Sequence, residues 1–62
     1  MKFSEWQKQN QYTNTELAKK LGIHVSYITH IHAGRKKPAL GLALKIEQLT
    51  RGKVTVEELF YP

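Results

Sequence analysis

Residues 13–34 hold the feature that most limits how this chain can fold. Two apolar pairs stand at helical spacing on either side of a glycine: Leu17 with Leu21, and Ile28 with Ile31. Gly22 lies between the pairs, and glycine takes a positive φ angle without the steric penalty of a Cβ atom. The stretch therefore predicts two short helices joined by a tight turn.

A small side chain on the first of these helices favours a close crossing of the pair. Ala18 stands four residues before Gly22, on the inner side of that helix, where a methyl group leaves room for a neighbour. Apolar, small, apolar and glycine positions followed by two apolar residues three apart are typical of a helix-turn-helix.

A capping signal marks where the first helix of the pair begins. Thr13-Asn14-Thr15-Glu16 has the form of a capping box, in which the Thr13 hydroxyl accepts from the Glu16 backbone N–H and the Glu16 side chain reaches back to the Thr13 N–H. The helix is therefore expected from Asn14 to about Lys20.

The second helix of the pair is expected from Val25 to about Ala33, closed by Gly34. His24 stands at its N-cap position, where serine, threonine or aspartate is the usual residue and histidine is a poor substitute. Ser26 is close enough to share the capping.

The N-terminal stretch predicts another helix, from Met1 to Asn10. Phe3 and Trp6 lie three apart on one face, and Trp6 is interpreted as a core residue because large aromatic side chains dominate small cores. Asn10-Gln11 is the expected turn, since asparagine tolerates left-handed backbone geometry.

The C-terminal third predicts two more helices. Pro38 precedes one from about Ala39 to Thr50, ended by Gly52, in which apolar residues repeat at spacings of four and three: Leu42, Ile46 and Leu49. Thr55-Val56-Glu57-Glu58 is a second capping box before a short helix from Val56 to about Phe60. The prediction is an all-α fold, a compact five-helix bundle, in a single domain over residues 1–62.

Composition restricts the setting and the partners of the chain. The 62 residues include no cysteine, so neither a disulfide nor a thiolate metal site is expected. No apolar run is long enough to span a membrane and no secretion signal is visible, which suits the cytoplasm. The net charge is +5 and the pI about 9.8, which suits a polyanionic partner.

The outer face of the expected helix 25–33 is polar and free of acidic residues. With Ile28 and Ile31 facing the core, the side chains left outside or at the rim are these: Val25, Ser26, Tyr27, Thr29, His30 and Ala33. Such a face suits contact with DNA phosphates and base edges, so this helix is expected to enter duplex DNA.

Three adjacent cations follow that helix at once. Arg35, Lys36 and Lys37 form a loop that ends at Pro38. Three such charges are often only a solvated loop, but here they leave the end of the DNA-contacting helix. They are therefore predicted to bind DNA phosphates, which supply most of the affinity in such complexes.

Metal and enzymatic sites are not expected. His30 and His32 are two apart, so their side chains point away from each other on a helix, and His24 completes no i, i+4 pair with either. No set of nucleophile, base and orienting group stands out, and no glycine-rich phosphate loop occurs. The chain is predicted to be no enzyme and to need no cofactor.

Taken together, the segments LAKKLGI, YITHIHAG, RKKP, LALKIEQLT and TVEELF resemble the Cro and repressor-type helix-turn-helix regulators of phages and bacteria, which include lambdoid and xenobiotic-response-element-like members. The resemblance covers nearly the whole chain, from Phe3 to Phe60. Its most specific positions are Leu17, Ala18, Leu21, Gly22, Ile23, Ile28, Ile31, Gly34 and Pro38. The resemblance implies a lambda-repressor-like fold and looks most like a stand-alone Cro-like protein.

The resemblance also implies roles for individual residues. Positions that contact bases in this family are occupied here by Val25, Ser26 and His30, with Thr29 as a further member of the set. Positions that bind phosphate are occupied by Thr13, Asn14, Thr15, His24, Tyr27, Arg35, Lys36 and Lys37. The family often places glutamine where Val25 stands, and valine offers only contact with a thymine methyl group.

The expected function is that of a sequence-specific transcriptional repressor. Its partner would be a pseudo-palindromic duplex operator with half-sites about 34 Å apart, bound by a homodimer. The dimer surface is expected near the C-terminus, at Val54, Val56, Phe60 and Tyr61, unless these residues only close the monomer core. The alternatives are an antitoxin or protein-interaction module with a toxin partner, and RNA binding. A bacterial cytoplasm, at the nucleoid, is the expected location.

Overall fold

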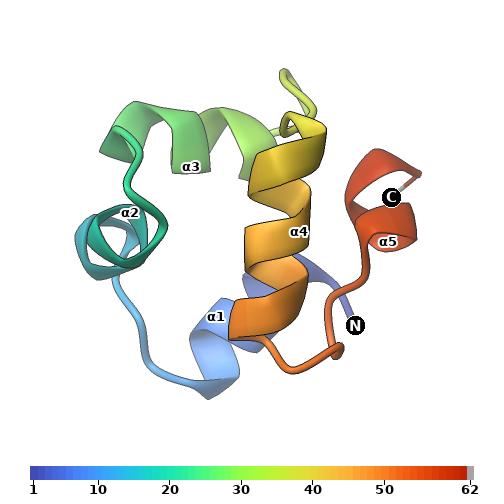
Figure 1. Cartoon of the computed structure of the whole chain (residues 1–62). Helices are drawn as coiled ribbons and strands as arrows, with labels where there is room; N and C mark the ends of the chain where they lie inside the picture. The colour runs from blue at the N-terminus through green and yellow to red at the C-terminus, as the bar shows by residue number, and fades with distance from the viewer. Residues whose placement is uncertain (62) are drawn as a thin grey trace.

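This computed structural model describes residues 1–61, which contain five α-helices and no strand (Figure 1). The helices are α1 (Phe3–Gln9), α2 (Asn14–Leu21), α3 (Val25–His32), α4 (Leu40–Leu49) and α5 (Val56–Phe60). The predicted all-α class is therefore confirmed. None of these helices is long and apolar enough to cross a membrane.

Helix boundaries differ from the predicted ones by one or two residues. The α1 helix is shorter than predicted at both ends, and its turn reverses at Gln11, with φ 58°, instead of at Asn10. Asn10 stays at φ −94° because its backbone N–H and its side-chain amide both bond to the Trp6 carbonyl. The turn therefore lies at Asn10-Gln11 as predicted, but Gln11 takes the left-handed conformation that was expected of Asn10.

The C-terminal ends of α3 and α4 fall before the expected residues. Ala33 and Thr50 are C-caps in place of last helical residues, and Gly34 follows Ala33 with φ 73°. Arg51 and Gly52 both have positive φ angles after α4, so that turn uses one residue that is not glycine.

The core is formed by side chains from all five helices. Trp6 is buried as predicted, and Leu17, Ile28 and Ile46 are completely inaccessible to solvent. The remaining buried apolar residues are Phe3, Ala18, Leu21, Leu42, Ala43, Val54 and Leu59. In Figure 1, α2 and α3 lie against each other along one side of the molecule, and α4 stands beside them near the centre.

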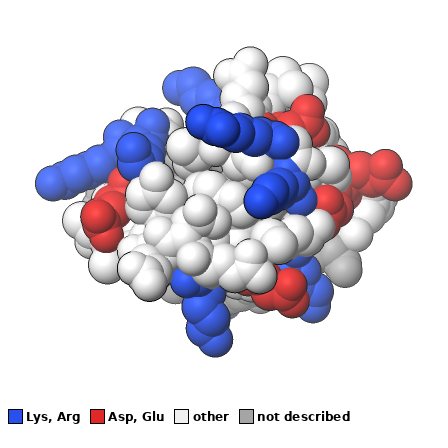
Figure 2. All heavy atoms as spheres, turned by 90° about the horizontal axis from the view of Figure 1, so that it is seen from below, with Lys and Arg blue, Asp and Glu red and all other residues white. Residues whose placement is uncertain are grey.

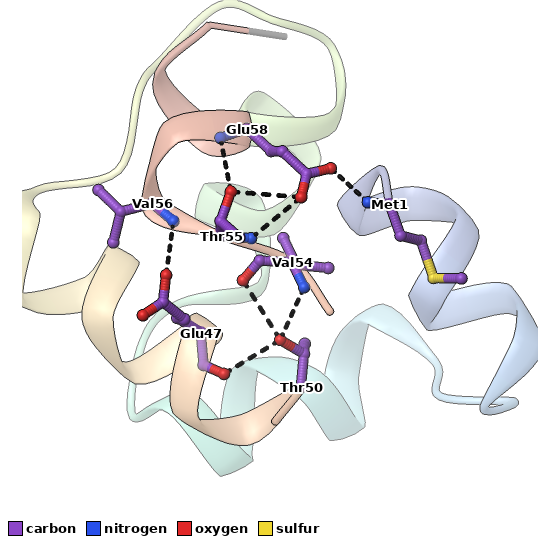
Figure 3. A network of polar contacts seen from close by, with 7 residues as sticks. All are labelled: Met1, Glu47, Thr50, Val54, Thr55, Val56 and Glu58. Atoms are coloured by element: carbon purple, nitrogen blue, oxygen red, sulfur yellow. Dashed lines mark hydrogen bonds and ion pairs between the residues drawn. The ribbon is translucent and has the colours of Figure 1, made fainter. Parts of the chain in front are cut away.

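The link between α4 and α5 is held by a buried hydroxyl (Figure 3). Thr50 Oγ1 accepts from the Val54 N–H at 3.1 Å and lies 3.2 Å from the Glu47 carbonyl oxygen. The Glu47 carboxylate accepts in turn from the Val56 N–H at 3.0 Å. These bonds satisfy polar groups that the turn would otherwise bury unpaired.

A capping box starts α5 as predicted, with Thr55 Oγ1 accepting from the Glu58 N–H at 3.1 Å. The Glu58 carboxylate also binds the ammonium group of Met1, which lowers the pKa of Glu58 below its ordinary 4.5. The start of the chain is thus tied to its last helix (Figure 3).

Val54 cannot belong to the dimer surface for which it was a candidate. Its side chain is fully buried, and Val56 and Phe60 are partly buried against the same core. Of the four C-terminal candidates only Tyr61 is largely exposed, at 78%. Val54 therefore closes the monomer core, which was the alternative interpretation.

Candidate nucleic-acid interface

The turn between α2 and α3 has the geometry that its sequence predicts. Gly22 caps α2 at φ 70° and ψ 34°, in the left-handed region, and the Ile23 N–H bonds to the Ala18 carbonyl at 3.0 Å. Leu17 of α2 and Ile28 of α3 are fully buried on the inner sides of the two helices. The packing therefore leaves the opposite side of α3 at the surface (Figure 1).

His24 caps α3, although histidine is a poor residue for that position. Its Nδ1 accepts from the Ser26 backbone N–H at 3.1 Å and lies 2.8 Å from Ser26 Oγ. Because Nδ1 accepts from an N–H, it carries a lone pair, and the Ser26 hydroxyl must be the donor. Ser26 therefore presents oxygen lone pairs to the outside.

The predicted base-contacting residues form two adjacent rows on α3. Val25 and Thr29 are four apart, as are Ser26 and His30, so each pair shares a side of the helix. Val25, Ser26 and Thr29 are exposed and His30 is partly exposed. The structure thus brings all four side chains together at the surface.

Tyr27 links α3 to the loop that follows it. Its hydroxyl oxygen accepts from the Ala39 N–H at 3.2 Å, and Lys36 Nζ lies 4.6 Å from the centre of its ring. The hydroxyl proton is not used in the bond to Ala39. Tyr27 therefore fixes the course of the loop and still has a proton to donate.

The cationic loop follows the C-terminal end of α3, and its Lys36 lies over the ring of Tyr27. Arg35, Lys36 and Lys37 are all exposed, and no aspartate or glutamate occurs in the sequence between Glu16 and Glu47. Figure 2 shows the side away from α3, where Lys and Arg side chains alternate with acidic ones. A stretch with only positive charges, following a polar helix, attracts polyanions locally.

The start of α2 also lies at the surface. The Thr13 hydroxyl accepts from the Glu16 N–H and the Glu16 carboxylate from the Thr13 N–H, both at 3.1 Å, which confirms the capping box. These bonds lower the pKa of Glu16 below its ordinary 4.5. Within residues 1–61 the N–H groups of Asn14 and Thr15 have no acceptor, so they can bind an anion.

The sequence model of the helix-turn-helix family matches residues 7–59, which include the end of α1, the whole of α2, α3 and α4, and most of α5. The chain belongs to the helix-turn-helix family. Members are DNA-binding transcription regulators, and the all-helical arrangement is a lambda-repressor-like fold. Searches among curated proteins and among solved structures found no match.

The helix-turn-helix domain contains one polar group of residues that its sequence did not reveal. Gln7 is buried in α1, although the sequence analysis assigned it no role, and it contacts His32 at the end of α3 and Asn14 at the start of α2. Burial lowers the pKa of His32 below its ordinary 6.5, so the ring is neutral at neutral pH. One signal was available in the sequence: Gln7 stands four residues after Phe3, which places both side chains on the same side of the helix.

The three histidines of the helix-turn-helix domain have separate surroundings. His24 caps α3, His30 lies on its outer side and His32 packs against Phe3, with ring centres 5.2 Å apart. Among the described residues, no three His, Cys, Asp or Glu side chains are grouped so as to hold a metal ion.

Proposed function

We propose that the protein is a transcriptional repressor that binds duplex DNA sequence-specifically, with α3 in the major groove. The observation that carries the proposal is the surface formed by α3 and the loop after it. A row of exposed, uncharged side chains is followed directly by three exposed cations, with no acidic residue nearby in the sequence. Uncharged side chains distinguish bases, while cations hold the backbone.

The chemistry of α3 favours A·T base pairs. The Ser26 hydroxyl donates a hydrogen bond to His24 and so presents its oxygen lone pairs outward, which match the exocyclic amino groups of adenine or cytosine. Val25 offers methyl groups that match the methyl of thymine. An A·T pair supplies both partners, so we propose at least one such pair under the start of α3.

The other two base contacts are less restricted in chemistry. His30 offers a ring nitrogen that can donate to guanine O6 or N7, and Thr29 offers a hydroxyl that can bond to several bases. Thr29 Oγ1 lies 3.5 Å from the Val25 carbonyl, which leaves its hydroxyl easily reoriented.

The phosphate contacts are proposed on both sides of α3. Arg35, Lys36 and Lys37 supply charge on one side. Uncharged donors supply the rest, through side chains or backbone N–H groups near the helix starts: Thr13, Asn14, Thr15, His24 and Tyr27. Such contacts fix the register of α3 on the duplex.

A homodimer on a pseudo-palindromic operator is part of the proposal, because one α3 covers only one half-site. With Val54 buried, the most exposed large apolar side chains are Leu40 and Leu44 of α4 and Tyr61 after α5, and they are the candidates for a dimer contact. Tyr61 also lies 5.4 Å from Lys37 Nζ, next to the cationic loop. Dimer formation there would keep both loops close to the DNA.

The two classes of contact can be separated by substitution. Arg35→Ala, Lys36→Ala and Lys37→Ala should each weaken binding to all sequences alike. Each should also reduce the slope of log affinity against log salt concentration by about one unit. Ser26→Ala and His30→Ala should cost about 1–3 kcal/mol at particular base pairs only. Binding titrations with matched duplexes at two salt concentrations measure both effects. A uniform loss for Ser26→Ala would contradict its proposed role.

A second candidate function is an antitoxin or protein-interaction module. Leu40 and Leu44, four apart on α4 and exposed by 59% and 46%, favour it, since they form an apolar strip that a protein partner could cover. DNA binding that does not change with salt would support this candidate over the repressor.

A further inference from the structure

The buried Gln7 side chain joins three helices at the edge of the proposed interface. Its Nε2 lies 2.7 Å from Asn14 Oδ1 and 3.1 Å from the Tyr12 carbonyl oxygen, and its Oε1 lies 2.5 Å from His32 Nε2. Only 8% of Gln7 is exposed. A side chain held by three partners at low exposure has a fixed orientation.

The direction of each hydrogen bond follows from the chemistry of the groups. The Tyr12 carbonyl can only accept, so the Gln7 amide nitrogen must face it. Gln7 Oε1 therefore faces the His32 ring and accepts from Nε2–H, which fixes the tautomer of that neutral imidazole. The second Nε2 proton of Gln7 is donated to Asn14, whose Oδ1 must accept it.

The orientation of Asn14 is thereby fixed as well. With Oδ1 turned toward Gln7, the Asn14 amide nitrogen points away from it, and no other described residue accepts from that nitrogen. Asn14 is partly exposed and lines an open hollow of about 280 Å³ with Gln7, Tyr12 and His32. Its two amide protons are therefore presented to an incoming acceptor.

We infer that Gln7 is a positioning residue for DNA binding: it holds Asn14 so that the amide donates to a DNA phosphate, and His32 holds Gln7. This inference rests on the proposed DNA-binding function and deepens it. Without Gln7 the Asn14 amide would rotate freely, and some of its orientations would place an oxygen against the phosphate. Neither Gln7 nor His32 touches the DNA in this arrangement.

A double-mutant cycle on a short labelled duplex of arbitrary sequence tests the inference. Gln7→Met keeps the length of the side chain and removes its hydrogen bonds, and Asn14→Ala removes the donor. Each should weaken binding by about two- to tenfold, the value of one hydrogen bond. The double variant should bind no more weakly than Asn14→Ala. Neither variant should change the salt dependence of binding, because both residues are uncharged.

Gln9→Met is the matched control, because Gln9 lies exposed on the same helix, and this variant should bind like the wild type.

The outcomes separate this inference from the proposed function. If the wild type does not bind the duplex even at low salt, where phosphate contacts should hold any sequence, both are overturned. Two results would overturn only the role of Gln7. In one, Gln7→Met binds the duplex like the wild type. In the other, Gln7→Met lowers the affinity equally in the wild type and in the Asn14→Ala background. NMR of the folded wild type gives a second measurement: the Asn14 side-chain amide signals should shift on adding duplex and those of Gln9 should not. Unshifted Asn14 signals would contradict the inference.

Discussion

The His24 imidazole has two effects at the start of α3. It caps the helix by accepting from the Ser26 N–H, and it also accepts a hydrogen bond from the Ser26 hydroxyl. The first effect concerns stability and the second concerns which bases Ser26 can contact. One surface side chain therefore couples the folding of the helix to the chemistry that it displays.

The cap predicts a graded effect of substitution at position 24. His24→Ala should lower the free energy of unfolding by about 1 kcal/mol, and His24→Asn should restore it fully, because asparagine is a preferred N-cap residue. Urea denaturation measures both values. His30→Ala on the same helix is the control and should change stability by less than about 0.5 kcal/mol. Equal stability of His24→Ala and the wild type would show that the cap contributes nothing.

Single residues also mark the limit of what the sequence predicted. The core positions and both capping boxes follow from spacing, and the structure confirms them. Gln7 and His32 could not be predicted to pair, since their contact joins α1 to α3 across 25 residues and needs the packed core. The DNA contacts assigned to individual residues remain predictions, although the structure places those side chains at the surface.

At the scale of elements, α2 is defined by a box at one end and a glycine at the other. Thr13 and Glu16 satisfy two backbone N–H groups at its start, and Gly22 reverses the chain after its last turn. Local signals therefore fixed both ends of α2 to within a residue. The start of α1 lacks a side-chain cap, and there the predicted boundary was two residues too early.

The capping box predicts a loss of stability in acid. The pKa of Glu16 in the folded protein lies below its ordinary 4.5, chiefly because its carboxylate accepts from the Thr13 backbone N–H. The contribution is therefore complete above the unfolded pKa and is lost as the pH falls through the folded one. Thermal unfolding between about pH 6 and 3 should show a smaller decline for Glu16→Gln than for the wild type. Glu5→Gln, exposed on α1, is the matched control. Parallel curves for Glu16→Gln and the wild type would contradict the prediction.

At the scale of the whole molecule, a small core supports α3, whose outer face we propose binds DNA. The buried face of α3 holds it against α2, and the α4–α5 link completes the core through Val54 and Thr50. In a chain of 62 residues, few interactions separate the folded from the unfolded state. In our proposal this small molecule offers α3 to the operator and the exposed side chains of α4, with Tyr61, to a partner subunit.

Two substitutions should separate core from dimer surface. Val54→Ala should lower the free energy of unfolding by about 2 kcal/mol, because it opens a cavity in the core, and leave the dimer contact intact. Leu44→Ser should change stability by less than about 0.5 kcal/mol and weaken self-association on a palindromic duplex. Denaturation and analytical ultracentrifugation measure the two effects. Unchanged assembly of Leu44→Ser would remove α4 from the dimer surface.

The central claim is that this helix-turn-helix domain recognises a specific duplex sequence through α3. Selection from a random-sequence duplex library at two salt concentrations tests it most directly. We predict enrichment of a pseudo-palindromic site with A·T pairs in each half-site, and affinity that falls steeply as salt rises. Weak, salt-sensitive binding without any enriched sequence, or no binding at all, would contradict the claim.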